Sequence, residues 1–170
     1  TAFTRYTDAE GRAVGEQRGA WRIRVSYVGG RELREKAEWF YGEQTTPSLT
    51  YTYTDPFTAE VTTASGDRWT ERYVRGDPYG RVAEIELSGG KHRYVNHRWL
   101  PGTNQAIESE LVDVATGTVL ERYRGTGLAD PQGNLQVEIV TPADGSKRFA
   151  YYQAGDPLSR KVYEEVPTTD

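Results

Sequence analysis

The sequence contains no cysteine, no methionine and only two histidines among its 170 residues. The lack of cysteine excludes disulfide frameworks, thiolate zinc sites, iron–sulfur clusters and cysteine nucleophiles. Two histidines leave little scope for a transition-metal site, and the sequence has no phosphate-binding or dinucleotide-binding glycine motif. We therefore predict neither a metal nor a cofactor. The absence of cysteine also agrees with an exported or periplasmic protein, although the localisation stays open.

Excess positive charge and long apolar runs are missing as well. Lys and Arg number 21 against 25 Asp and Glu, which gives a formal net charge of −4. Because nucleic acids are bound mainly through an excess of basic side chains, we do not expect a nucleic-acid partner. No stretch approaches the 18 consecutive apolar residues of a membrane-spanning helix, so no transmembrane segment is expected.

What the sequence does have is alternation. Apolar and polar residues alternate over residues 21–27, 50–54, 83–87 and 135–139. This period of two is typical of antiparallel strands with one buried face. Glycine-containing turn signals separate these segments at hairpin length, and 12 tyrosines add to the strand-forming character. The sequence therefore predicts an all-β fold.

Residues 31–41 fit two structures. The segment is rich in Glu, Lys and Arg, and Leu33, Ala37 and Phe40 have helical spacing. As a strand it places Leu33, Ala37, Trp39 and Tyr41 on one face, with a glutamate among them. We favour the strand, because Gly29 and Gly30 suit a hairpin with residues 21–28.

One hairpin pattern occurs twice. Residues 61–81 match residues 140–160 at a constant offset of 79, with nine identities in 21 positions. Each copy is expected to contain a strand, a glycine turn, a second strand and a Gly-Asp-Pro turn. Residues 110–125 form a looser third copy. The pattern indicates either an internal duplication or hairpins of equal length that use the same turn residues.

These observations predict one domain over residues 1–170. The expected architecture is an antiparallel up-and-down barrel, or a strongly curved half-barrel, of about ten strands. Closure or bending is expected because a flat sheet of that size leaves exposed edges and one uncovered apolar face.

The opening hairpin resembles that of small lipocalin-like barrels of the allene oxide cyclase type, which include the spirotetronate-cyclising Diels–Alderases. The resemblance rests on an acidic turn and spaced glycines, namely Asp8, Gly11, Val14, Gly15 and Gly19, followed by Trp21 and Ile23. It implies a barrel around a small ligand and a cyclising activity. It implies no particular catalytic residue.

The same opening is similar to the outer-membrane lipoprotein carriers. The shared residues are Phe3-Thr4, Asp8, Gly11, Ala13-Val14, Glu16, Gly19 and Trp21. This likeness implies a periplasmic protein that shields acyl chains. The helices of those carriers are not evident in this sequence. Both resemblances imply a curved antiparallel sheet around an apolar ligand.

The strand alternation itself predicts which side chains line such a site. Inward-facing aromatic and aliphatic residues either fill the centre of a barrel or surround a ligand. Their phenol and indole groups could orient a bound molecule. The predicted ligand-binding residues are Trp21, Ile23, Tyr27, Tyr51, Tyr53, Trp69, Tyr73 and Tyr151.

The predicted function is the binding of a small apolar or amphipathic molecule, with cyclisation or isomerisation of that molecule left open. One alternative is a periplasmic lipid or lipoprotein carrier. A second alternative is a β-hairpin scaffold for protein interactions that has neither a cavity nor an activity. Catalytic residues are not predicted, and a homodimer stays open.

The ionisable residues support no clear catalytic site. His92 and His97 lie five residues apart on one expected strand, 91–100, and therefore point to opposite faces. The glutamates of the pairs Glu84/Glu86 and Glu108/Glu110 are each two residues apart on a strand. This puts them roughly 7 Å apart, a distance that paired-carboxylate hydrolases could use. We interpret both pairs as solvent-facing.

Overall fold

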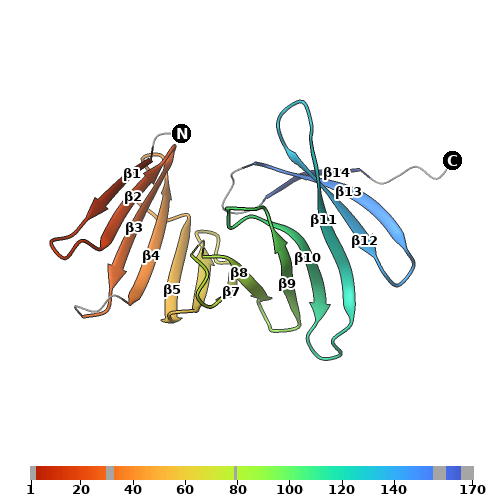
Figure 1. The fold of residues 1–170 in the computed structure, drawn as a ribbon, viewed down its shortest axis with the longest axis horizontal. Helices are drawn as coiled ribbons and strands as arrows, with labels where there is room; N and C mark the ends of the chain where they lie inside the picture. The colour runs from red at the N-terminus through yellow and green to blue at the C-terminus, as the bar shows by residue number, and fades with distance from the viewer. Residues whose placement is uncertain (1–2, 30–32, 79, 155–159, 166–170) are drawn as a thin grey trace. The chain divides into compact units, whose positions relative to one another are not determined.

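The computed structural model describes residues 3–29, 33–78, 80–154 and 160–165. Every regular element in them is a β-strand (Figure 1). The strands are β1 (Phe3–Thr7), β2 (Ala13–Arg18), β3 (Trp21–Tyr27), β4 (Arg34–Tyr41), β5 (Leu49–Asp55), β6 (Thr58–Thr63), β7 (Arg68–Tyr73), β8 (Val82–Leu87), β9 (His92–Trp99), β10 (Ala106–Asp113), β11 (Val119–Ala129), β12 (Leu135–Thr141), β13 (Ser146–Tyr152) and β14 (Lys161–Glu165).

The strands form an up-and-down sheet in which spatial order equals sequence order, from β1 to β14. Each strand pair whose register is known is antiparallel. The all-β, antiparallel prediction is therefore confirmed. The predicted number of about ten strands is wrong, because strands that mostly have five to eight residues, with short turns between them, fit fourteen into the chain. The first and last strands are not paired with each other, so the sheet is not closed into a barrel.

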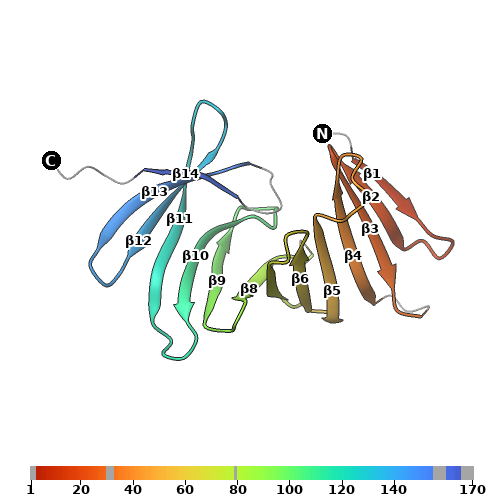
Figure 2. The same cartoon turned by 180° about the vertical axis from the view of Figure 1, so that it is seen from behind.

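The chain divides into two compact units. Unit 1 comprises Thr1–Arg75 and Ile85–Ser88, and unit 2 comprises Gly76–Glu84 and Gly89–Asp170. Within unit 1, β2 to β5 lie side by side, as the view from behind also shows (Figure 2). The prediction of a single domain stays a prediction. Among the described residues, no helix has the length and apolar character to cross a membrane.

The ambiguous segment 31–41 is a strand where it is described, from Arg34 to Tyr41, which confirms the favoured prediction. Its residues pair with β3 on one side and β5 on the other. Two ladders of backbone hydrogen bonds therefore outweigh the helical propensity of its Glu, Lys and Ala residues.

The two matching segments both fold as hairpins. In the first copy β6 and β7 are joined through Gly66, and in the second β12 and β13 are joined through Gly145. Both glycines have a positive φ, 94° and 71°, which a residue with a Cβ rarely adopts. The second Gly-Asp-Pro turn, at 155–157, falls outside the described residues.

Each unit has its own buried residues. In unit 1, Leu49 at the start of β5 and Ala59 and Val61 on β6 are fully buried. In unit 2, the most deeply buried residues are Ile139 on β12 and Ala150 on β13. The small size of this core reflects a single layer of sheet, since the strands pack mainly against their neighbours in the sequence.

Candidate ligand-binding face

One face of unit 1 collects most of its aromatic side chains. Residues directly opposite each other in an antiparallel pair lie on the same face of the sheet. The register pairs Ile23 with Trp39, Trp39 with Leu49, and Val61 with both Tyr51 and Trp69. We call this surface the aromatic face. Its rings are Trp21, Tyr27, Trp39, Tyr41, Tyr51, Tyr53, Trp69 and Tyr73.

The rings form two groups of contacts across the strands. The ring centroids of Trp21 and Trp39 are 6.1 Å apart, and those of Trp39 and Tyr51 are 6.3 Å apart. Tyr53 and Tyr73 stack at 6.4 Å with an interplanar angle of 29°. These five rings are half-buried. The aliphatic residues Leu49, Ala59 and Val61 on the same face are completely buried. The rings therefore shield the sheet and still present part of their surface to solvent.

A carboxylate lies within the aromatic face. Glu71 on β7 is only 8 % exposed and is directly opposite Ala59. The indole Nε1 of Trp69 donates a hydrogen bond to its Oε1 at 2.9 Å, and the Tyr73 hydroxyl donates one to its Oε2 at 2.8 Å. Burial raises the pKa of Glu71, and these two hydrogen bonds offset that effect only in part.

Burial also affects the phenols around Glu71. The pKa values of Tyr51 and Tyr73 are raised, mainly by burial and next by the nearby charge of Glu71. Both phenols are therefore neutral at physiological pH and act as hydrogen-bonding groups rather than as bases. Glu71 is the carboxylate buried among these rings, whereas Glu16, opposite Ile23 on the same face, forms an ion pair with Arg18.

A β-bulge brings a cation to the aromatic face. Ser26 pairs with Lys36 but Tyr27 pairs with Arg34, so β4 has one extra residue at this point. The bulge turns Arg34 toward the side of Tyr27, and its guanidinium interacts with the phenols of Tyr27 and Tyr53. Arg34 therefore marks one end of the aromatic face.

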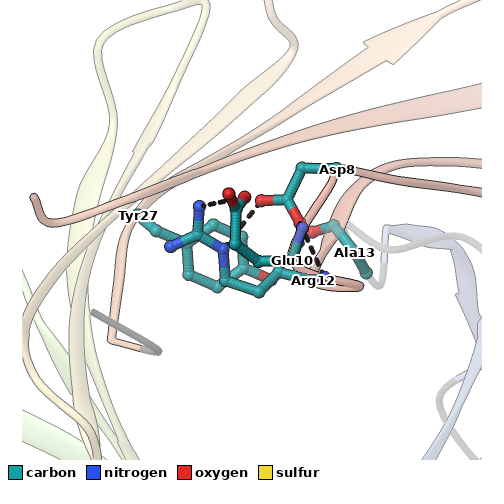
Figure 3. Close-up of polar contacts among 5 residues, drawn as sticks. All are labelled: Asp8, Glu10, Arg12, Ala13 and Tyr27. Carbon is teal, nitrogen blue, oxygen red and sulfur yellow. Dashed lines mark hydrogen bonds and ion pairs between the residues drawn. The ribbon is translucent and has the colours of Figure 1, made fainter. Parts of the chain in front are cut away.

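Tyr27 is held from its other side by the β1–β2 turn (Figure 3). Its hydroxyl donates to the backbone oxygen of Ala13 at 2.8 Å, and the Arg12 guanidinium lies 5.0 Å from its ring centroid. Asp8 fixes Arg12 through its Oδ2, 2.7 Å from Arg12 Nε. Although desolvation raises the pKa of Asp8, the hydrogen bonds and charge of Arg12 outweigh it and hold that pKa below its usual range. The phenol of Tyr27 thus stabilises the β1–β2 turn through its hydrogen bond to Ala13.

The opposite face of unit 1 carries paired charges. Glu38 lies between Arg24 Nη2 at 2.7 Å and Lys36 Nζ at 3.0 Å, and Arg72 Nη2 lies 3.0 Å from Glu86 Oε2. Two shallow depressions occur near Arg22, whose guanidinium already donates to the backbone oxygens of Gly42 and Gln44. These features are those of a solvated surface.

Seven of the eight predicted ligand-binding residues lie on the aromatic face, and Tyr151 does not. Tyr151 belongs to β13 of unit 2, where its ring stacks on Tyr163 at 4.4 Å. Its hydroxyl accepts a hydrogen bond from Gln136 Nε2 at 2.7 Å. The role of these residues in binding stays a prediction.

Unit 2 has a carboxylate with aromatic neighbours of its own. Glu121 on β11 accepts a hydrogen bond from Tyr123, whose ring centroid is 5.6 Å from that of Tyr94. Here a cation is present, because Arg148 Nη2 lies 2.5 Å from Glu121 Oε1 and its Nε lies 2.8 Å from Glu164. The charges of this cluster are compensated within the chain.

The other ionisable candidates have structural partners. His97 Nε2 lies 3.0 Å from Glu110, which also contacts Arg122 at 3.0 Å. Asn96 donates to the backbone oxygen of Val82 and so joins β9 to β8. In the parts of the chain that the structure describes, no group of three or more His, Asp or Glu residues is arranged to hold a metal ion.

The sequence reasoning missed Glu71 and Arg34. Glu71 could have been found, because the period of two places it on the same side of its strand as Trp69 and Tyr73. Arg34 could not, since the bulge that redirects it has no sequence signal in this segment. No protein-family model matches the sequence, and no curated protein matches it.

Proposed function

We propose that this protein binds a small amphipathic molecule on the aromatic face of unit 1. The observation that carries the proposal is that half-buried rings share one face of the sheet with the buried carboxylate of Glu71, which Trp69 and Tyr73 contact. Rings supply apolar contact area, and a few fixed polar groups orient the bound molecule.

The geometry favours binding over a purely structural role for these rings. Within the described part of unit 1, the strands contact mainly their neighbours in the same sheet. Unit 1 itself, where it is described, has no second layer of strands over these rings. A flat apolar molecule that covers about 150 Å² of ring surface gains roughly 4 kcal/mol before the cost of association. This supports weak, reversible binding.

A titration with a neutral amphiphile tests the proposal. We expect 4-phenylbutan-1-ol to change the tryptophan fluorescence of the protein saturably. Trp21→Ala and Tyr53→Phe should each weaken this binding several-fold, with circular dichroism unchanged. Trp99→Phe, on β9 in unit 2, is the matched control and should leave the affinity as it is. Absence of a saturable response, or equal affinity in all variants, contradicts the proposal.

The second candidate is a β-hairpin interaction scaffold, and the open sheet favours it. Successive hairpins without closure present long solvent-facing surfaces rather than an enclosed cavity. A scaffold would bind no small molecule in the titration above. Cyclisation or isomerisation of a ligand, lipoprotein carriage, a periplasmic location and a homodimer stay predictions from the sequence.

A further inference from the structure

We infer that the aromatic face selects a cationic ligand, a tertiary or quaternary ammonium that carries an apolar group, and that Glu71 is its counter-charge. This inference rests on the proposed function, because it names the ligand class of the same face. Three observations carry it: the missing cation at Glu71, the rings beside the carboxylate, and the contrast with the related hairpin in unit 2.

The first observation concerns charge compensation. Among the described residues, Glu71 is the one charged residue that is buried. Its two hydrogen-bond partners, Trp69 and Tyr73, are neutral donors, and it forms no ion pair within the described chain. Other partly covered carboxylates do, as Glu38 does with Arg24. A buried carboxylate without a cation is costly, and a bound cation reduces that cost.

The second observation is the set of rings. Trp69 and Tyr73 stand on either side of Glu71 on β7, and Tyr53 stacks against Tyr73. Ammonium groups are attracted to the faces of such rings within about 6 Å of the centroid. In the described residues no Arg or Lys stacks on Trp69 or Tyr73, so those ring faces are not already used by a cation of the chain.

The third observation comes from the two matching hairpins. At the offset of 79, Trp69 in the first copy corresponds to Arg148 in the second. Arg148 neutralises Glu121 within unit 2. Glu71 itself corresponds to Ala150, so the buried carboxylate occurs in the first copy alone, with an aromatic donor at the position that Arg148 has in the second.

Arg34 indicates where on the aromatic face the ammonium group would bind. Its guanidinium interacts with Tyr27 and Tyr53 but forms no ion pair with Glu71 within the described residues. The ammonium is therefore expected at the Trp69 and Tyr73 side of the carboxylate. The apolar group would then extend over Tyr51, which like Trp69 lies opposite Val61, and over Trp39, whose ring centroid is 6.3 Å from that of Tyr51.

The test compares two molecules of the same shape, benzyltrimethylammonium and its uncharged carbon isostere neopentylbenzene. Tryptophan fluorescence of the full chain is titrated with each at pH 8, where the carboxylate is most fully ionised. We expect the cation to bind at least tenfold tighter than the isostere. We expect Glu71→Gln, which keeps the shape and the acceptor oxygen, to abolish this preference. Glu60→Gln, on the opposite face of β6, should retain it.

Each outcome decides a different question. Equal binding of cation and isostere overturns the ammonium inference and leaves the proposed function standing. Binding of neither molecule, together with no response to 4-phenylbutan-1-ol, overturns the proposed function itself. A preference that survives in a folded Glu71→Gln variant places the cation elsewhere and overturns the role of Glu71. If that variant does not fold, the comparison of the two molecules on the unchanged protein still decides the ligand class.

Discussion

The indole N–H of Trp69 points at the carboxylate of Glu71, two residues further along the same strand, at 2.9 Å. Side chains two apart on a strand share a face, so an aromatic residue and a long acidic residue can meet there without help from another strand. Tyr73 repeats the arrangement from the other side at 2.8 Å. A local Trp-x-Glu-x-Tyr pattern thus creates a buried carboxylate with two neutral donors.

Glu71→Gln is expected to stabilise the free protein at neutral and alkaline pH. Because burial raises the pKa of Glu71 in the folded state, the folded protein favours the protonated form. The stability that protonated Glu71 contributes is present in full below its pKa in the unfolded chain. It is lost as the pH rises through the raised pKa of Glu71 in the folded protein. Removing the charge should raise the Tm at pH 8 by roughly 2–4 °C, which corresponds to a gain of about 1 kcal/mol in the free energy of unfolding. Thermal melts from pH 4 to pH 8 should show a flatter profile for the variant, and an identical profile contradicts the expectation.

Tyr73→Phe is expected to destabilise the protein by about 1–2 kcal/mol, because it leaves Glu71 Oε2 without its donor. The same substitution in the Glu71→Gln background should cost less, since an amide needs the donor less than a charged carboxylate does. A double-mutant cycle by urea denaturation measures the difference. A coupling of zero would show that the two groups do not interact in solution.

Ala59→Leu is expected to destabilise unit 1 by about 1–3 kcal/mol through overpacking. Ala59 is fully buried and directly opposite both Tyr53 and Glu71, so a larger side chain must displace the rings. Ala64→Leu is the control, because Ala64 is exposed in the β6–β7 turn. Equal stability of both variants would mean that the rings do not close over β6.

Gly66→Ala and Gly145→Ala are expected to cost about 1–2 kcal/mol each, because both turns need a positive φ. Neither position has an atom within 4 Å of an added Cβ, so the cost is conformational rather than steric. Gly125→Ala provides the control, since that glycine has no positive φ and its added Cβ makes only ordinary contacts with Ile107. Chemical denaturation measures the free energy of unfolding of the three variants. A loss in Gly66→Ala and Gly145→Ala without a loss in Gly125→Ala assigns the cost to backbone conformation rather than to steric contact.

Much of unit 1 follows from the alternation of residue types. The alternation over residues 21–27 and 50–54 places Ile23 and Tyr51 on the face where the structure has them. The strand over 31–41 also follows, although its composition suits a helix. The number of strands does not follow, because strands such as β1 and β14 show no regular alternation of apolar and polar residues.

Part of the candidate site can also be predicted from the alternation of residue types. Aromatic residues on regular strands, such as Trp69 and Tyr73, can be assigned to one face by counting. Arg34 cannot, because a bulge shifts its side by one residue. The separation of Tyr151 from the other predicted residues also has no local signal, because the division of the chain into two units depends on long-range contacts.

The agreement between spatial and sequence order has a consequence for how such a chain can form and change. Every strand pair of known register joins immediate neighbours along the chain, which keeps the loops to be closed short and favours rapid, stepwise assembly. A duplication or loss of one hairpin would alter the length of the sheet without breaking any other pairing. The two matching hairpins at 61–81 and 140–160 are what growth by such units would leave behind.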